Sequence, residues 1–166
     1  EQIAEMKAQI AEDASGGKVA FFTRRYRKVI LMAFCIAMFN QLSGINAILY
    51  YAPKVMKLAG GEQVLGPAFP YVASVIVGLM NLIATMAALT VIDKIGRRQL
   101  MIVGSIGYLI SLGFLSAIMF AYKGGKFEQN SAVPVWLILI GLLAFIASHA
   151  FGQGSVIWVF ISEIFP

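Results

Sequence analysis

Charged residues are scarce in this sequence of 166 residues: only 13% are Asp, Glu, Lys or Arg, while 60% are hydrophobic. A water-soluble domain of this length needs a much larger polar fraction to cover its surface. An ordinary soluble domain is therefore excluded. The net charge of +5 does not point to nucleic acid as a partner, because the basic residues gather between long apolar runs.

Cysteine and histidine are almost absent as well. The single cysteine, Cys35, cannot form a disulfide within the chain and argues against cysteine-based metal binding. We find no phosphate-binding loop, no cluster of metal ligands and no nucleophile placed with a base. The sequence therefore predicts no enzyme activity, no catalytic residue, no cofactor and no metal site.

Long apolar runs are what the sequence has instead. A helix needs about 20 mainly apolar residues to cross the hydrocarbon of a bilayer. Four runs meet this length, at about residues 29–54, 69–92, 100–121 and 133–160. They lack the alternation of a barrel strand, so they predict an all-α membrane protein with four transmembrane helices. The last run is long enough to tilt, or to break near Gly152 and Gly154.

The connections between the runs differ in basic residues. Arginine occurs only before the first run and between the second and third, where the basic residues include Lys18, Arg24, Arg25, Arg27, Lys28, Lys94, Arg97 and Arg98. An excess of such residues marks cytoplasmic segments, so both chain ends are predicted to be cytoplasmic. We expect residues 1–28 to form an amphipathic cytoplasmic helix and a basic linker, and residues 29–166 to form a transmembrane bundle.

Three segments occur in a recognisable order and spacing: NQLSGINAILYY at residues 40–51, DKIGRR at 93–98, and the stretch from Trp158 to SEIFP at 162–166. Together they resemble the sugar porter family of the major facilitator superfamily. That family includes facilitative glucose transporters and proton-coupled xylose symporters. The resemblance covers nearly the whole chain and corresponds to transmembrane helices seven to ten of twelve.

The resemblance implies a partial C-terminal half of a twelve-helix sugar transporter that works by alternating access. Its partners would be a monosaccharide, protons if it is a symporter, the lipid bilayer of a plasma or inner membrane, and the missing N-terminal half and remaining C-terminal helices. Uniport and proton symport stay open. The chain begins without methionine and stops where its fourth helix would reach the cytoplasm, so we expect further segments.

The amides of Gln41 and Asn46 lie inside the first apolar run. A long amide in hydrocarbon needs a hydrogen-bond partner or a wet cavity, whereas Ser43 and Gly44 can be explained by helix packing. On a straight helix the two amides would point roughly 140° apart. We therefore expect a local distortion near Ser43 and Gly44, which would let both amides meet the hydroxyl groups of a sugar.

The resemblance implies that six side chains contact the sugar or line its cavity: Gln41, Asn46, Asn81, Trp158, Asn40 and His149. Asn40 stands where the family usually has a glutamine. Trp158 would stack on the sugar, although tryptophan also anchors helices at the membrane interface. His149 stands at the level of a family aromatic residue that can face the cavity, but a lone histidine in a helix is more often a packing residue.

Asn81 belongs to a stripe on the second run that also contains Ser74, Gly78 and Thr85. We interpret Ser74 and Gly78 as a seam of small residues at which helices pack. Asn81 is the member of the stripe whose polar amide is most unfavourable in hydrocarbon. Its position resembles that of a family asparagine that faces the sugar.

Charged residues near the predicted cytoplasmic end suggest a gate. Asp93, Arg97 and Arg98 form a turn with topogenic charges, and Glu163 reaches the same depth on the fourth run. The resemblance implies that these residues latch the bundle through bidentate bonds and release during transport. At the opposite end, Tyr50 and Tyr51 are either ordinary interfacial tyrosines or, by resemblance, a cover for the outer cavity.

Two other functions remain open from the sequence. A sugar-sensing receptor could use the same scaffold to bind a sugar without moving it. A purely structural four-helix membrane protein would show no change at all when sugar is added.

Overall fold

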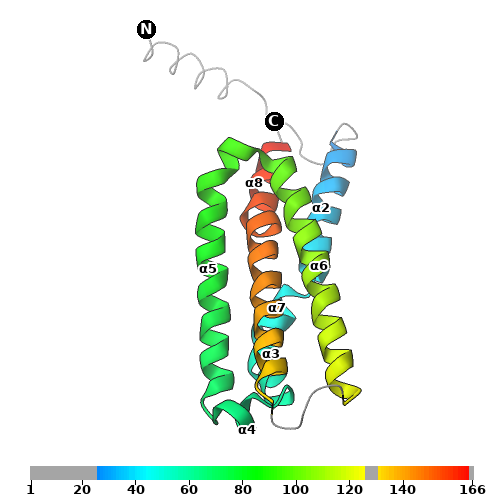
Figure 1. Ribbon diagram of the computed structural model, residues 1–166. Coiled ribbons are helices and arrows are strands. Elements are labelled where there is room, and N and C mark those ends of the chain that lie inside the picture. The colour runs from blue at the N-terminus through cyan, green and yellow to red at the C-terminus, as the bar shows by residue number, and fades with distance from the viewer. Residues whose placement is uncertain (1–25, 126–130, 165–166) are drawn as a thin grey trace, which may run out of the picture.

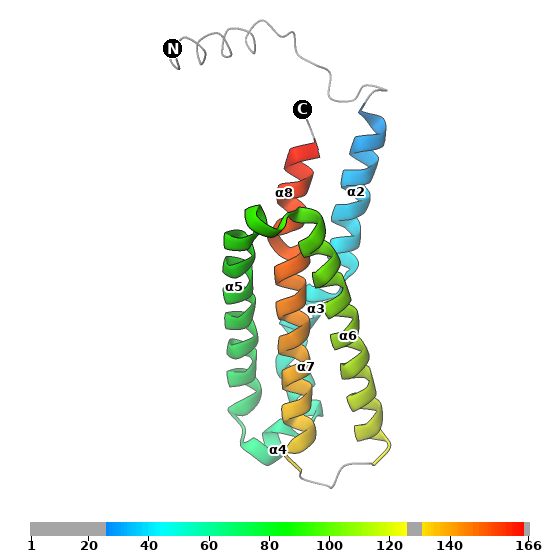
Figure 2. The same ribbon diagram turned by 45° about the horizontal axis from the view of Figure 1, so that its top comes forward.

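The computed structural model describes residues 26–125 and 131–164, which form helices joined by short turns and contain no strand. The predicted amphipathic helix and most of the basic linker lie outside these residues. Four helical segments are long and apolar enough to cross a membrane, as predicted. The start of the first segment, the connection between the second and third, and the end of the fourth lie at one end of the bundle (Figures 1 and 2).

Two of the four spans are interrupted. The first consists of α2 (Arg27–Leu42) and α3 (Ile45–Leu58), and is followed by the short α4 (Gly61–Leu65). The second and third are the continuous helices α5 (Phe69–Ile95) and α6 (Arg97–Lys123). The fourth consists of α7 (Val133–His149), the π-helical η1 (Ala150–Gly154) and α8 (Ser155–Ile164). The break predicted near Gly152 is thus a π-helical segment.

The first span ends later than predicted. Pro53 lies inside α3, which continues to Leu58 instead of ending near residue 54. Proline is tolerated within a membrane helix when the surrounding structure compensates for the missing N–H group. The last turn of α3 is further supported by an ion pair between Lys57 Nζ and Glu62 Oε2 at 3.3 Å.

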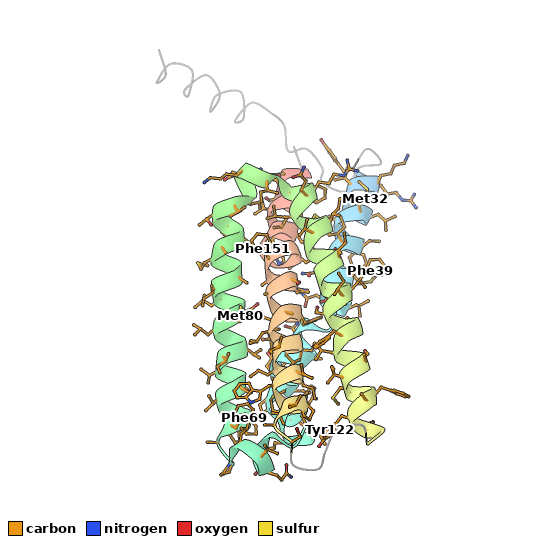
Figure 3. The ribbon with its side chains drawn as sticks, in the orientation of Figure 1. Met32, Phe39, Phe69, Met80, Tyr122 and Phe151 are labelled. Carbon is orange, nitrogen blue, oxygen red and sulfur yellow. The ribbon has the colours of Figure 1, made fainter. Side chains whose placement is uncertain are left out.

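The fourth span occupies the centre of the bundle. Within its most apolar window 56% of the residues are buried, against 17–22% in the other three spans. The helix α7 packs along α6 and also contacts α3 and α5. Its buried side chains Ile138, Phe145 and Ile146 form the core together with Met56 and Val77. The outer helices expose large apolar side chains such as Met32 and Phe39 (Figure 3), as expected of surfaces that face lipid or other helices.

Glycines allow α6 and the fourth span to approach closely. A Cβ atom on Gly104 of α6 would lie 2.8 Å from the Ser148 carbonyl oxygen and 2.9 Å from the Gly152 nitrogen. The π-helical segment therefore lies directly against the backbone of α6.

The small residues that are buried on α5 are Ala73, Ala84 and Ala88. No described atom lies within 4 Å of the position that a Cβ of Gly78 would take. Gly78 therefore packs against no residue of the described chain, and its interpretation as a packing residue stays a prediction about helices outside this chain.

Substitution of Gly104 by alanine should destabilise the fold. The added methyl group would meet backbone atoms of η1, which cannot move aside as a flexible side chain can. We expect Gly104→Ala to lower the free energy of unfolding by about 1–3 kcal/mol, measured by thermal unfolding in detergent. The control is Gly113→Ala on the same helix, where no described atom lies within 4 Å. Equal stability of the two variants would contradict the close crossing.

Candidate functional site

The first span breaks in its polar stretch, as the sequence predicted. Leu42 ends α2, Ile45 begins α3, and Gly44 between them has a φ of 85°. This left-handed conformation is costly for residues that carry a Cβ. No described atom lies within 4 Å of the position that a Cβ of Gly44 would take. Glycine is therefore favoured here by its backbone conformation, and within the described chain Gly44 packs against no neighbouring helix.

The break brings two predicted sugar ligands together. Asn46 Nδ2 donates a hydrogen bond of 3.0 Å to Gln41 Oε1, and both residues are exposed. A straight helix would have pointed the two side chains roughly 140° apart. The pair leaves the NH₂ group of Gln41 (Nε2) as a donor and the side-chain oxygen of Asn46 (Oδ1) as an acceptor. A donor beside an acceptor matches a hydroxyl group, which can both accept and donate.

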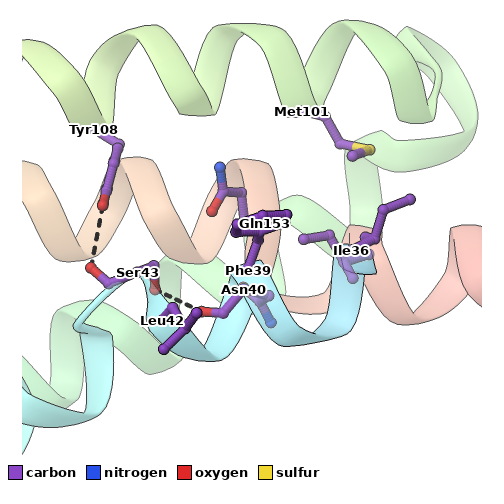
Figure 4. Close-up of a pocket in the computed structure, with 9 residues that line it drawn as sticks. Ile36, Phe39, Asn40, Leu42, Ser43, Met101, Tyr108 and Gln153 are labelled. Atoms are coloured by element: carbon purple, nitrogen blue, oxygen red, sulfur yellow. Dashed lines mark hydrogen bonds between the residues drawn. The ribbon is translucent and has the colours of Figure 1, made fainter. Parts of the chain in front are cut away.

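Ser43 is the centre of a hydrogen-bond network at the break. Its hydroxyl group donates to the backbone carbonyl oxygen of Asn40 at 2.6 Å and lies 2.9 Å from His149 Nε2. Because the hydroxyl proton is directed to Asn40, His149 Nε2 acts as the donor to Ser43 Oγ. The Tyr108 hydroxyl group donates to the Ser43 carbonyl oxygen at 3.1 Å (Figure 4). The interpretation of Ser43 as a packing residue was therefore incomplete.

His149 is buried, with 3% of its surface exposed. Its ring centroid lies 6.2 Å from those of Tyr108 and Phe145. These contacts favour the packing interpretation of His149 over a position facing an open cavity.

A pocket of about 420 Å³ opens beside this network (Figure 4). It is lined by Ile36, Phe39, Asn40, Leu42, Ser43, Met101, Tyr108, Gln153 and Ile157. Among the six predicted sugar residues, Asn40 alone contributes to this lining. Asn40 is 6% exposed, and its Oδ1 atom has no hydrogen-bond partner within the described parts of the chain. The polar side chains that line the pocket come from the first, third and fourth spans.

Two residues of this region were missed in the sequence. Gln153 donates from Nε2 to Ser105 Oγ at 2.9 Å and so links η1 to α6. Its signal was present, because an amide between two glycines in an apolar run is as costly as Gln41. Tyr108 gave a weaker signal, since tyrosine is largely apolar, although its hydroxyl group inside the third run also needs a hydrogen-bond partner.

Asn81 and Trp158 are placed on different helices, α5 and α8. Asn81 is half-buried and its carbonyl oxygen accepts a hydrogen bond from Thr85, while Trp158 is 52% exposed. Within the described chain neither side chain forms a hydrogen bond, and neither lines the pocket. Their contact with a sugar remains a prediction.

At the end of the bundle where α5 meets α6, three predicted gate residues come together. Arg97 contacts Glu163 Oε1 through Nη2 at 2.7 Å and through Nε at 3.2 Å, and its Nη2 lies 3.2 Å from Asp93 Oδ1. Both contacts to Glu163 use one carboxylate oxygen, so the bidentate arrangement over two oxygens was not found. Arg98 is exposed and forms no ion pair within residues 26–125 and 131–164.

The two tyrosines proposed as a cover, Tyr50 and Tyr51, lie on the exposed surface of α3. Their position is compatible with either interpretation given from the sequence.

Several known proteins to which this chain is similar are named as sugar transporters. Residues 1–166 match the protein family described as "Sugar (and other) transporter". An arabinose-proton symporter of Bacillus subtilis is 31% identical over 166 residues, which are 100% of this chain and 33% of that protein. A D-xylose transporter of Levilactobacillus brevis is 33% identical over 156 residues, which are 94% of this chain and 32% of that protein. The D-xylose-proton symporter of Escherichia coli (strain K12) is 35% identical over 138 residues, which are 83% of this chain and 25% of that protein. The chain spans about a third or less of the length of these relatives.

The break itself can be tested at Gly44. Gly44→Ala should destabilise the protein by about 1–2 kcal/mol, because alanine is strained at this positive φ although space is available. Gly44→Asn should cost less, since asparagine tolerates the left-handed conformation better. The control is Gly78→Ala, which has equal space and no such φ. Thermal unfolding that ranks Gly78→Ala as the most harmful variant would refute the assignment.

Proposed function

The chain belongs to the sugar transporter family, and from this premise we propose that it is part of a monosaccharide transporter that works by alternating access. The observation that carries the proposal is the pairing of Gln41 with Asn46 across the helix break. Polar side chains at membrane depth are usually functional, and irregular backbone is tolerated there when it lines a cavity. The names of three relatives favour pentoses, arabinose and xylose, as the first sugars to try.

Sugar binding would use the donor and the acceptor that the pair leaves free. The Gln41 amide donates to one hydroxyl oxygen, while the Asn46 carbonyl oxygen accepts from a hydroxyl group of the same sugar. Trp158, half-exposed on α8, would add a flat apolar surface for the C–H faces of the ring. Asn40 and Asn81 would contribute further contacts. Within the described chain, the Asn40 Oδ1 atom and the Asn81 side chain have no hydrogen-bond partner that would compete with the sugar.

The remaining part of the cavity would come from outside this chain. In a transporter of this type, two halves rock against each other and expose a central site to either side of the membrane. The end of the bundle that carries Arg27, Lys28, Lys94, Arg97 and Arg98 would be cytoplasmic. There, the contact of Arg97 with Glu163 would hold α6 against α8 and be released when the site opens inward.

Uptake by the full-length protein that carries this chain tests the function. Radiolabelled D-xylose, L-arabinose and D-glucose are offered to proteoliposomes with and without an uncoupler. We expect saturable uptake of at least one sugar, and loss of accumulation with the uncoupler identifies proton symport. Binding without uptake would instead indicate a sugar-sensing receptor, and neither binding nor uptake would indicate a structural protein.

In the same assay, Gln41→Ala should weaken sugar affinity about 5–150-fold. The variant leaves a sugar hydroxyl group unpaired after its water has been removed, which costs about 1–3 kcal/mol. Thermal stability should change little, because Gln41 is exposed and the only described hydrogen bond of its side chain is to Asn46. The control is Gln99→Ala, which removes an exposed amide at the start of α6. Parent-like binding by Gln41→Ala would show that the amide is structural.

Loss of the Glu163 charge should favour states open on the cytoplasmic side. Without the negative charge of Glu163, Arg97 keeps an ion pair only with the exposed Asp93 among the described residues. We expect Glu163→Gln to shift the population by about 1–2 kcal/mol, or about 5–30-fold, and to weaken sugar affinity measured from outside. Alkylation of a cysteine introduced into the cytoplasmic cavity reports the shift. Arg98→Gln changes the charge of the same turn without breaking a described ion pair, and an equal effect of both variants would exclude a specific latch.

A further inference from the structure

We infer that Tyr108 and His149 are positioning residues, which fix the helix break at Ser43 and thereby align Gln41 and Asn46 for the sugar. The inference rests on the proposed function, because it concerns the same two amides. Neither Tyr108 nor His149 needs to touch the sugar in this arrangement.

The first reason is that the break creates a hydrogen-bonding problem. Backbone groups between two helices lose their helical partners, and hydrocarbon offers no water to replace them. Here the replacement comes from other spans: Tyr108 of α6 donates to the Ser43 carbonyl oxygen, and His149 of α7 holds the Ser43 hydroxyl group. Ser43 in turn donates to the Asn40 carbonyl oxygen. Three spans thus converge on one residue.

The second reason is that little else holds this part of the first span. Only Ala33 and Asn40 are buried on α2. Within the described residues, apolar packing therefore contributes little to fixing the direction in which the end of α2 points. The hydrogen bonds from Tyr108 and His149 to Ser43 can do so, because they join the break to α6 and to the central α7.

The third reason is that the two donors are themselves held firmly. The rings of Tyr108 and Phe145 lie 5.1 Å apart, and both lie 6.2 Å from the ring of His149. Phe145 and His149 are buried. A donor whose ring cannot rotate freely transmits its position to the group that it contacts.

Ser43 stands between the two amides, two residues after Gln41 and three before Asn46. A rotation of its peptide group changes the relative direction of α2 and α3 and so separates the amides. Loss of either donor should therefore act on sugar affinity through Gln41 and Asn46. A purely structural network would lower stability alone, whereas a direct sugar contact would act independently of the amides.

The decisive variant is Tyr108→Phe in the full-length protein, because it removes one hydroxyl group and keeps the ring. We expect D-xylose, or L-arabinose if that is the sugar taken up, to bind about 5–10-fold more weakly, with an unfolding temperature close to that of the parent. The matched control is Ser111→Ala on the same helix, whose hydroxyl group bonds only to the carbonyl oxygens of Gly107 and Tyr108. Its sugar affinity should stay within twofold of the parent.

A double-mutant cycle identifies the route of the effect. In the Gln41→Ala background, Tyr108→Phe should cause a smaller loss of affinity than in the parent, because only the Asn46 amide remains to be aligned. Independent, multiplicative losses would overturn the inference, since Tyr108 would then act elsewhere. His149→Leu should weaken binding like Tyr108→Phe, and His149→Gln, which restores an N–H donor, should recover most of the affinity.

The outcomes separate this inference from the proposed function. If the parent protein neither binds nor transports a sugar, the proposed function fails and the inference fails with it. If the parent transports and Gln41→Ala weakens binding while Tyr108→Phe binds like the parent, only the positioning role is overturned. If both Tyr108→Phe and His149→Leu lower stability and leave affinity unchanged, the network is structural.

Discussion

Every backbone group that leaves a helix inside hydrocarbon needs another hydrogen-bond partner, and this requirement organises the bundle. Two spans depart from regular α-helix, at Ser43–Gly44 and at Ala150–Gly154. The third span faces both departures: Tyr108 reaches the first, and Gly104 lies against the second. Because α6 is itself continuous from Arg97 to Lys123, it provides a straight support for both irregular spans.

The polar residues of the first span connect this architecture to the proposed sugar transport. An amide in a membrane helix is unfavourable unless it is paired, and Gln41 and Asn46 partly pair with each other. Their remaining donor and acceptor suit a ligand that carries hydroxyl groups. The helix break is therefore more than a packing irregularity, since it converts two residues on different faces of a helix into one hydrogen-bonding pair. Membership of the sugar transporter family agrees with this chemistry.

Much of this could be predicted from local sequence. Run length predicted the four spans, the spacing of Gln41 and Asn46 predicted the distortion, and charge placed Arg97 and Glu163 at one end. The features that were missed depend on contacts between distant residues. Ser43 resembles any small packing residue until His149, 106 positions away, is placed 2.9 Å from its hydroxyl group. Which residues of α5 are buried depends likewise on the neighbouring helices, and within the described chain the buried small residues are Ala73, Ala84 and Ala88.

The connection at Gly96 restricts how the bundle can change shape. It is the single residue between α5 and α6, so two peptide units limit the distance between the Cα atoms of Ile95 and Arg97 to about 7 Å. The second and third spans therefore form a hairpin that cannot spread apart at this end. Since Arg97 belongs to the hairpin and Glu163 to α8, separating their helices would require the fourth span to be displaced relative to the hairpin as a unit.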